Sequence, residues 1–313
     1  MNAIRLIFID AVFNEALSQL QLLPENVELN TENGFSLQVP ANTKIADPIY
    51  VYFLNKGKNT VLKNKIILAE NSELTLIEEY HADHLDKYIT DVSMVLQFGK
   101  NALLHYAKVQ NENKKATHQY SMQVTQLTGS SLYLFLTDLG SHIAKIQIQV
   151  NLSERDAIFD VKGLYFLNED NQYIDNNIQV KHDAPFSVSG MSFKGVLDKK
   201  SRAVFFGKVI VEQKAEHISA NQSNHNLLLS SQAEINIKPH LEVYANEIKC
   251  CRHGATVGQL DKEALFYLRS RGIEEKMALQ LLIEGFTADM TNQIVNPMIR
   301  SYIEKKVVSH AKL

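Results

Sequence analysis

The sequence predicts a mainly β protein that ends in a small all-α domain. Two observations support this. Between about Ile49 and Ile248 apolar and polar residues alternate with a period of two, the pattern of half-buried strands, and no long helical stretch intervenes. After Gly258 the apolar spacing changes to that of amphipathic helices. The alternation alone leaves a sandwich, a barrel and a β-helix open, because no strict hexapeptide repeat is visible.

The first 48 residues form an N-terminal lead-in segment, in which Asn14 to Leu23 can form one short helix before Pro24. Its apolar stretch is interrupted early by Asp10, and no small-residue cleavage site follows, so we expect no signal peptide. No run approaches the ~18 apolar residues of a membrane helix. The cysteines, Cys250 and Cys251, are adjacent and give no disulfide framework. We therefore expect a cytoplasmic protein.

Residues 49–257 are assigned to the β domain. A clear example is the run in which Val92, Met94 and Leu96 alternate with Ser93, Val95 and Gln97. Each such run places one face toward a core and one toward water. Short turn-like segments separate the runs. Examples are Asn55–Gly57, Thr128–Ser130, Asn168–Asn171 and Asp198–Lys200.

Residues 258–313 are assigned to a helical domain. Asp261 can cap a first helix, which Gly272 terminates. A second helix can run from Glu274 to Phe286, with Met277, Ala278, Leu281 and Leu282 on one face. A third can run from Ala288 through Tyr302, bent or broken at Pro297.

Composition narrows the function. The chain has 313 residues, of which 45% are hydrophobic, enough for a sizeable core. Its net charge of -3 gives no general electrostatic attraction to nucleic acid or to an anionic membrane. It has no P-loop, no GxGxxG pattern, no GxSxG elbow and no HExxH helix, which argues against the commonest enzyme classes.

One segment is rich in metal-binding residue types. Six imidazole or thiol side chains fall within 37 positions: His217, His225, His240, Cys250, Cys251 and His253. Thiolate and imidazole together suit iron, zinc or an iron–sulfur cluster. The pattern alone also fits structural histidines and buried cysteines that act as small hydrophobic residues.

Several sequence blocks carry a family resemblance. They are Asn226–Ser230, Ala233–Pro239, Leu241–Cys250, His253–Gly258 and Leu265–Ile273, with Arg5–Asp10 and Lys200–Gly207 upstream. Together they resemble the SufB/SufD family over nearly the whole chain. SufB-like chains tend to carry a glutamate after the matching histidine and a cysteine in the next helix. Here Gly254 follows His253 and the helix reads Leu268–Arg271, so the resemblance favours the SufD branch.

The resemblance implies a right-handed parallel β-helix followed by a helical domain. It also implies a non-enzymatic scaffold subunit of the SUF system for iron–sulfur cluster assembly. Such a subunit pairs with SufB through edge strands and binds SufC, an ABC-type ATPase, through its helices. A nascent cluster or iron is then shared with SufB, and no cofactor is held tightly by the isolated chain. A homodimer is expected when SufB is absent.

The resemblance also assigns residues. His253 is the expected cluster ligand at the interface, with Cys250 and Cys251 as weaker candidates, because SufB supplies a cysteine and a glutamate. Expected contacts to SufC are Phe266, Tyr267, Arg269 and Arg271, although the two aromatic residues could instead pack the helical domain. Expected contacts to SufB or to a second copy are Leu241, Val243, Ala245 and Lys249.

Two departures from the family pattern stand out. The site reads Lys249-Cys-Cys-Arg-His-Gly254, one residue longer than the family's Lys-Cys-x-His-Gly. Either cysteine could match the family cysteine, and a β-bulge could absorb the extra residue. SufD proteins also usually carry a longer N-terminal helical region.

The sequence leaves two alternatives open. The first is a carbohydrate-active β-helix enzyme, which needs paired carboxylates; the candidates are Asp156 with Asp160 and Asp170 with Asp175. These acids are placed as solvated turn residues rather than as a catalytic pair. The second is a SufB-like subunit that holds a cluster of its own.

Overall fold

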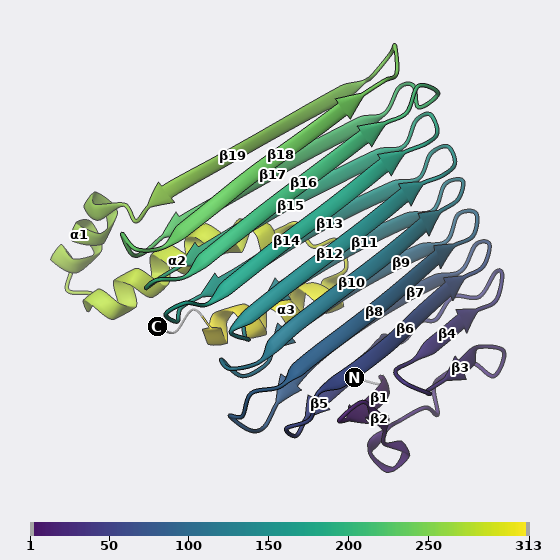
Figure 1. Cartoon of the computed structure of the whole chain (residues 1–313), viewed down its shortest axis with the longest axis horizontal. Coiled ribbons are helices and arrows are strands. Elements are labelled where there is room, and N and C mark those ends of the chain that lie inside the picture. The colour runs from purple at the N-terminus through teal and green to yellow at the C-terminus, as the bar shows by residue number, and fades with distance from the viewer. Residues whose placement is uncertain (1–2, 311–313) are drawn as a thin grey trace.

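The computed structural model describes residues 3–310 and shows a long parallel β-solenoid followed by three helices (Figure 1). The prediction of a parallel β-helix with C-terminal helices is confirmed. The strands are β1 (Ile4–Ile9), β2 (Val12–Phe13), β3 (Glu28–Asn30), β4 (Ser36–Val39), β5 (Ile49–Asn55), β6 (Thr60–Leu68), β7 (Glu73–Ala82), β8 (Ile89–Phe98), β9 (Leu103–Asn111), β10 (Thr117–Gln126), β11 (Ser131–Asp138), β12 (Ile143–Leu152), β13 (Ile158–Leu167), β14 (Tyr173–His182), β15 (Val188–Leu197), β16 (Arg202–Val211), β17 (Ser219–Leu228), β18 (Glu234–Val243) and β19 (Cys250–Gln259). The helices are the 3-10 turn η1 (Glu15–Leu17), α1 (Lys262–Ser270), α2 (Glu275–Asn292) and α3 (Pro297–His310).

Successive strands alternate between two walls. Sheet A contains β1, β2 and the odd-numbered strands from β5 to β19, and sheet B contains β3, β4 and the even-numbered strands from β6 to β18. Strands β5 to β18 form seven two-stranded coils, and β19 begins the next one. Neighbouring coils pair in parallel and in register, so each side chain stacks on its equivalent in the next coil.

The core lies between the two sheets. On β8 the predicted inward residues Val92, Met94 and Leu96 are no more than 1% exposed, and their polar neighbours face outward. At the N-terminal end aromatic rings add a second kind of packing, because Phe53 stacks on Phe8 and on Tyr80 at 4.9 Å each. Alternation thus places the apolar half of each strand inside.

One edge of the solenoid is turned by residues in the left-handed conformation. Asn42, Asn71 and Asn101 stand at equivalent turns with φ of 58°, 55° and 54°. Asparagine tolerates this region better than most residues. The amide Nδ2 of Asn71 donates to Oδ1 of Asn42 at 2.9 Å, and Nδ2 of Asn101 donates to Oδ1 of Asn71 at 3.1 Å. The turns therefore form a side-chain ladder along the solenoid.

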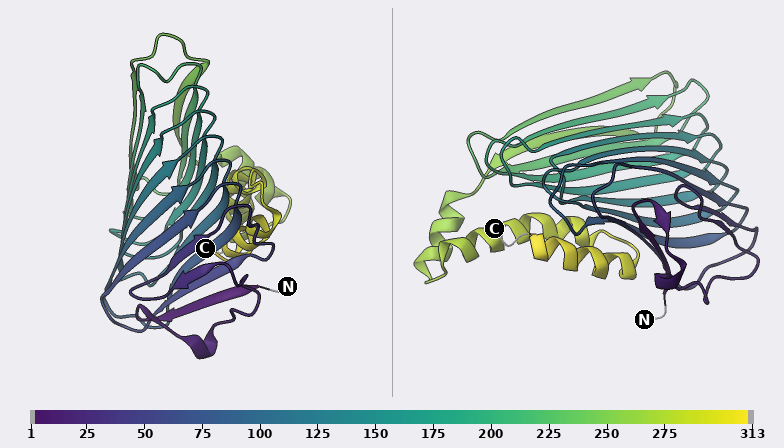
Figure 2. Two further views of the ribbon diagram at one scale, coloured as in Figure 1. Left: turned by 90° about the vertical axis from the view of Figure 1, so that its right-hand side faces the viewer. Right: turned by 60° about the horizontal axis from the view of Figure 1, so that its bottom comes forward.

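Helices α2 and α3 cover part of the outer face of sheet A (Figure 2). Ile283 and Met290 of α2, with Ile299 and Ile303 of α3, are buried in a cluster that includes residues of β7, β9, β11, β13, β15 and β17. In contrast, α1 has no buried residue and projects beyond the solenoid. The two long helices thus share their core with the sheet.

Ion pairs at the ends of the two helices fix them to sheet A. Lys194 of β15 contacts Asp289 of α2 at 2.5 Å and donates to the carbonyl oxygen of Phe286 at 2.7 Å. Lys306 of α3 contacts the buried carboxylate of Glu79 on β7 at 2.6 Å.

The helix boundaries differ from the prediction. The second helix does not end at Phe286 but continues to Asn292. Of the two possibilities predicted at Pro297, a bend or a break, the structure shows the break, and the third helix runs from Pro297 to His310. Proline suits the first helical position because its missing N–H has no partner to lose. The side chain of Asn296 completes this start by accepting from the backbone N–H of Met298 and Ile299 at 3.0 and 3.2 Å.

The predicted N-terminal helix is also shorter than expected. Only Glu15–Leu17 form a helical turn, because Gln19 pairs with Arg5 in an antiparallel bridge and draws the chain back along β1. At this end of the solenoid β2 and β3 run antiparallel to β1 and β4. Across residues 3–310, none of the helices has the length and apolarity needed to cross a bilayer.

Candidate functional site at the open end of the solenoid

The C-terminal end of the solenoid exposes two strand edges. In the described part of the chain β18 is paired only with β16, and β19 only with β17. The segment from Leu241 to Lys249, where the sequence predicts the partner edge, is divided: β18 ends at Val243, and residues 244–249 form the turn into β19. The second edge, β19, lies beyond the predicted segment.

Strand β19 pairs with β17 without interruption, from Cys250 opposite Ser219 to Gln259 opposite Leu228. The extra residue before the histidine therefore causes no bulge within this strand. Cys251 packs against the core, so it points inward. His253, two residues further along, lies on the same inner face, and Cys250 lies on the opposite one. The Cys-x-His spacing of the family pattern thus falls on Cys251 and His253.

The inner face of β19 is accessible because no further coil covers it. His253 and its neighbour Gly254 are exposed, and no heavy atom lies within 4 Å of the position that a Cβ would take at Gly254. Another chain can therefore approach the imidazole closely. Among residues 3–310, no three histidine, cysteine or acidic side chains lie close enough together to hold a metal ion.

The two thiols differ in environment. Both are free and half-buried. Burial raises the pKa of the Cys251 thiol, and the neighbouring Cys250 adds to this effect. A thiol with a raised pKa is a weaker nucleophile and metal ligand, since the thiolate is the reactive form. Burial therefore disfavours the thiolate of Cys251 in the isolated chain.

The other histidines of the segment are directed elsewhere. His217 stacks on Phe186 with ring centroids 5.2 Å apart. Nε2 of His240 lies 3.0 Å from the carboxylate of Glu242, and Nδ1 of His225 lies 2.7 Å from the hydroxyl of Thr256. The fold thus does not gather the six candidate metal-binding residues into one site.

The four residues predicted to contact SufB or a second copy lie along β18 and its turn. Leu241 and Ala245 pack against the core and are half-buried. Val243 is 38% exposed, and Lys249 is also exposed. The exposed members of this set, Val243 and Lys249, lie near the beginning of β19, where Cys250 and Cys251 stand.

The four residues predicted to contact an ATPase lie on α1 and just after it. Phe266 is 74% exposed and Tyr267 is 57% exposed, so neither ring packs the helical segment. Arg271 lies over the Tyr267 ring at 5.2 Å, and Arg269 contacts Glu275 at 3.3 Å. Of these two contacts, the one between Arg269 and Glu275 joins α1 to the start of α2.

Two apolar residues of α2 extend this surface. Met277 is 58% exposed and Leu281 is 44% exposed, close to the α1–α2 junction. The helical period predicted one packing face for them with Ala278 and Leu282; Ala278 is buried and Leu282 half-buried, whereas Met277 and Leu281 remain exposed. We call Phe266, Tyr267, Met277 and Leu281 the α1–α2 surface.

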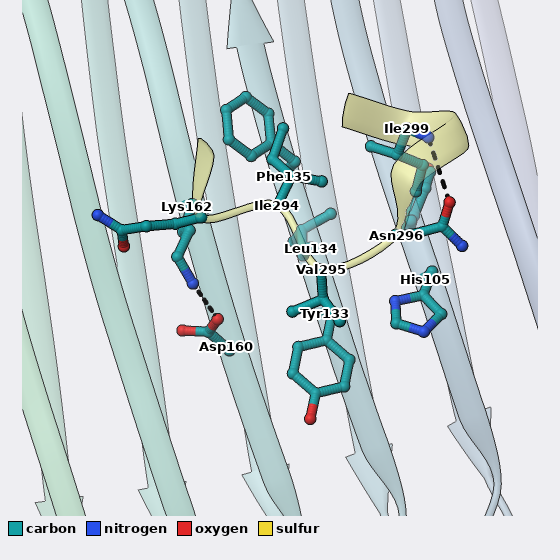
Figure 3. Close-up of a pocket in the computed structure, with 12 residues that line it drawn as sticks. His105, Tyr133, Leu134, Phe135, Asp160, Lys162, Ile294, Val295, Asn296 and Ile299 are labelled. Atoms are coloured by element: carbon teal, nitrogen blue, oxygen red, sulfur yellow. Dashed lines mark hydrogen bonds and ion pairs between the residues drawn. The ribbon is translucent and has the colours of Figure 1, made fainter. Parts of the chain in front are cut away.

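A cavity beneath the α2–α3 turn is too small to bind a substrate. It is lined by His105, Tyr133 and the Asp160–Lys162 ion pair on sheet A, and by Gln293–Asn296 above them (Figure 3). Its volume is about 20 Å³, which is room for about one water molecule. His105 stacks on Tyr133 at 5.2 Å, and burial lowers the pKa of its imidazole. The arrangement seats the turn on the sheet.

The carboxylates considered for a glycosidase lie in different settings. Asp156 is in a turn at φ 61° and pairs with Arg155. Asp160 pairs with Lys162 on the outer face of sheet A. Asp170 accepts from the backbone N–H of Lys200 in a turn, and Asp175 accepts from the Tyr173 hydroxyl on β14. Each is thus engaged with a local partner rather than with the second carboxylate of its proposed pair.

Comparison with known proteins gives a consistent result. Residues 52–286 match the family model described as SUF system FeS cluster assembly, SufBD core domain. The chain is 30% identical over 82% of its length to the iron–sulfur cluster assembly SufBD family protein slr0076 of Synechocystis. It is 26% identical over 98% of its length to the iron–sulfur cluster assembly protein SufD of Escherichia coli, and 27% identical over 87% to the chloroplastic protein ABCI7 of Arabidopsis thaliana. It spans 59%, 79% and 59% of the lengths of these three relatives.

Proposed function

Because this chain belongs to the SufBD family of iron–sulfur cluster assembly proteins, we propose that it is a non-catalytic scaffold subunit of the SufD type. In this role it pairs with a SufB partner, binds the ATPase SufC and contributes a ligand to a nascent cluster at the shared interface. The observation that carries the proposal is His253, exposed on the inner face of β19, an edge strand that pairs with β17 on one side only in the described part of the chain.

The SufD assignment is supported by two features. The match to the Escherichia coli SufD protein covers 98% of the chain. In addition, Gly254 follows His253 at the position where SufB-like chains tend to carry a glutamate. The same features argue against a SufB-like subunit that holds its own cluster.

Pairing with SufB would use the strand edges. An unpaired edge presents a row of backbone N–H and C=O groups that another strand can continue. Leu241, Val243, Ala245 and Lys249 lie on or just after β18, and β19 provides the second edge. When SufB is absent, a second copy of this chain can take its place.

The cluster is cargo, and the chain supplies only part of its coordination. A neutral imidazole is a good ligand for iron, and His253 is already exposed to a partner. The remaining ligands, a thiolate and a carboxylate, would come from SufB. Cys250 and Cys251 play a lesser part, because burial disfavours the thiolate of Cys251. The isolated chain then holds iron or a cluster only transiently.

SufC would dock on the α1–α2 surface, with Arg269 and Arg271 beside it. A motion imposed there would pass to α2, which Lys194 fixes to β15. β15 pairs with β17, and β17 with β19. The site and the ATPase surface are thus connected through packed elements that can move together.

A cytoplasmic location fits the free thiols of Cys250 and Cys251.

The test compares His253→Ala with His225→Ala in a complex co-expressed with SufB and SufC. His225 is a matched control because it lies on the neighbouring strand β17 but on its outer face, where its ring is hydrogen-bonded to the hydroxyl of Thr256. We expect His253→Ala to form the complex but to lose iron, sulfide and the visible absorption of the cluster. His225→Ala should keep them, and Cys250→Ala and Cys251→Ala should lose less than His253→Ala. Wild-type cluster content in His253→Ala would reject the ligand role, and failure of the complex to assemble would favour a structural role.

A further inference from the structure

The interior of the last complete coil is unusually polar. Gln222, Asn224 and Asn226 on β17 point inward and are 5%, 1% and 2% exposed. In the other coils of this half of the solenoid, most inward positions are apolar. A buried amide costs free energy unless its groups are hydrogen-bonded. These three amides therefore require partners.

Hydrogen bonds within the chain satisfy only some of the polar groups of these three amides. The hydroxyl of Tyr165 and the amide of Asn226 bond to each other, and Nδ2 of Asn226 donates to Oδ1 of Asn224. Nε2 of Gln222 crosses to sheet B and donates to the carbonyl oxygen of His240 on β18 at 3.2 Å. Within residues 3–310, Oε1 of Gln222 and Nδ2 of Asn224 remain without a partner.

Gln222 is the register neighbour of His253. Both residues lie on the inner face of sheet A, on adjacent parallel strands about 4.8 Å apart. The inward residues of the two edge strands near His253 offer no side-chain oxygen: they are Ile235, Ile237, Pro239, Leu241 and Val243 on β18, and Cys251, Ala255 and Val257 on β19. Gln259, also inward, lies six residues further along β19, about 20 Å away. On β17 the oxygen of Asn224 is already occupied by Asn226. The free acceptor beside His253 is thus Oε1 of Gln222.

Gly207 on β16 gives the Gln222 amide room to turn. A Cβ at Gly207 would lie 2.6 Å from Oε1, so the oxygen rests in the space that the glycine leaves. The last torsion of a glutamine is soft. A rotation about this torsion turns Oε1 toward β19 without a change in the backbone, and it releases the hydrogen bond from Nε2 to His240.

We propose that Gln222 is a positioning residue for His253, whose ring N–H donates to Oε1 of Gln222 and whose other ring nitrogen is thereby left free for a metal. Histidines that bind metals generally donate their second nitrogen to an oxygen, which fixes the tautomer and the ring orientation. This inference rests on the proposed function for the identity of the metal, but the hydrogen bond itself can be tested without it.

The test uses the full chain labelled with ¹⁵N at histidine. Long-range ¹H–¹⁵N spectra report which ring nitrogen carries the proton, and His253→Ala identifies the His253 signals among the 11 histidines. We expect one tautomer to dominate in the wild type. Gln222→Met, which has a similar length but no oxygen, should populate both tautomers. Gln123→Met, on the exposed outer face of sheet B, is the matched control and should behave as the wild type.

Gln222→Glu separates positioning from structural support. It keeps an acceptor oxygen for His253 but loses the donor to His240, so the tautomer preference should survive. Loss of the preference in this variant, or equal tautomer populations in the wild type and Gln222→Met, would overturn the proposal. Gly207→Ala provides an independent check should Gln222→Met fail to fold. It displaces the Gln222 oxygen from its resting space and should preserve or strengthen the preference, and a weakened preference would count against the proposal.

Zn²⁺ alone serves as the metal probe, followed through the ¹⁵N shifts of His253. We expect Gln222→Met to bind it about tenfold more weakly than the wild type, within the range found when such outer hydrogen bonds are removed. Unchanged affinity would contradict the positioning role. The two claims can fail separately. If the tautomer and Zn²⁺ results are as expected, the positioning role of Gln222 stands. If His253→Ala nevertheless keeps wild-type cluster content, the proposed function is rejected.

Discussion

The ammonium group of Lys108 on β9 lies 3.1 Å from the carboxylate of Asp138 on β11, and both side chains are buried between the two sheets. A buried ion pair is costly to break, because removing one partner leaves an uncompensated charge in a medium of low dielectric constant. The pair therefore links two neighbouring coils through their interior.

We predict that Lys108→Met lowers the free energy of unfolding by about 3–5 kcal/mol. Urea denaturation measures the change. Lys44→Met is the control: Lys44 pairs with Glu73 at 3.2 Å but is 73% exposed, and such surface pairs contribute at most about 1 kcal/mol. The double variant Lys108→Met/Asp138→Leu should lose less than the sum of the two single variants. Additive losses would show that the two charges do not interact.

The second prediction concerns acid stability. His182 is buried, with its ring nitrogens 2.7 and 2.8 Å from the hydroxyls of Ser187 and Ser189. Burial lowers the pKa of His182 to about 4. The unfolded chain binds a proton here below its ordinary pKa of about 6.5, whereas the folded chain does not until about pH 4. Stability is therefore lost as the pH falls through this window.

The size of this loss follows from the width of the window and is about 3 kcal/mol. Comparing the wild type with His182→Leu isolates the effect, because other acid-sensitive groups are common to both proteins. We expect the stability gap between them to narrow by about this amount between pH 7 and pH 4. Urea midpoints at four pH values suffice. A gap independent of pH would mean that His182 titrates normally in the fold.

The third prediction concerns the attachment of α3. The carboxylate of Glu79 is 5% exposed and bonds to Lys306 at 2.6 Å and to the hydroxyl of Tyr302. Hydrogen bonds to a charged group contribute about 1.5–3 kcal/mol, so Glu79→Gln should increase local opening of α3 about tenfold or more. Hydrogen exchange of residues 297–310 measures this. Lys305→Met, on the exposed side of the same helix, should leave exchange unchanged. Equal protection in both variants would mean that apolar packing alone holds α3.

The fourth prediction concerns α1. None of its residues is buried, so the helix depends strongly on its cap, where a carboxylate oxygen of Asp261 accepts from the N–H of Glu263 at 2.9 Å and of Ala264 at 3.1 Å. Asp261→Ala should cost about 1 kcal/mol and lower hydrogen-exchange protection in α1 about fivefold. Asp261→Asn, which can still cap, should retain most of the protection. If both variants behave alike, contacts with α2 rather than the cap stabilise α1.

The fifth prediction concerns the open end and depends on the proposed pairing. The isolated chain should dimerise at high concentration through β18 and β19. Val257, 52% exposed on the inner face of β19, would lie within this interface. Val257→Lys should weaken the dimer by at least tenfold, because it adds an unpaired charge on each side. Val61→Lys is a control with similar exposure, 61%, on β6 near the opposite end. A wild type that sediments as a monomer at high concentration would reject self-pairing.

Alternation in the sequence identified strands reliably but could not select a solenoid. The period of two is the same in a sandwich and a β-helix, because both bury one face of each strand. The distinguishing signal lies in the turns. The ladder residues Asn42, Asn71 and Asn101 are separated by 29 and 30 residues, which is the length of one coil. A search for asparagine at that interval, rather than for a hexapeptide repeat, would have found the fold.

The strands around the candidate site were the least predictable. In β17 the inward residues are Gln222, Asn224 and Asn226, so the usual alternation of apolar and polar residues is absent. In β19 no coil covers the inner face, and glycines at 254 and 258 weaken the strand signal further. Because the inner face of β19 is not covered in the single chain, its residues need not alternate between apolar and polar types, and the sequence shows no strand pattern there. The resemblance, not the periodicity, located His253.

The two ends of the solenoid are built differently, and under the proposed pairing this difference limits how large an assembly can grow. At the N-terminal end β2 and β3 have only two and three residues and run against the parallel direction of their sheets, so they are poor templates for a further strand. If both ends were open, copies could add head to tail and polymerise into a fibre. With a single growing end, two chains that meet there block each other's growth, and association stops at a pair.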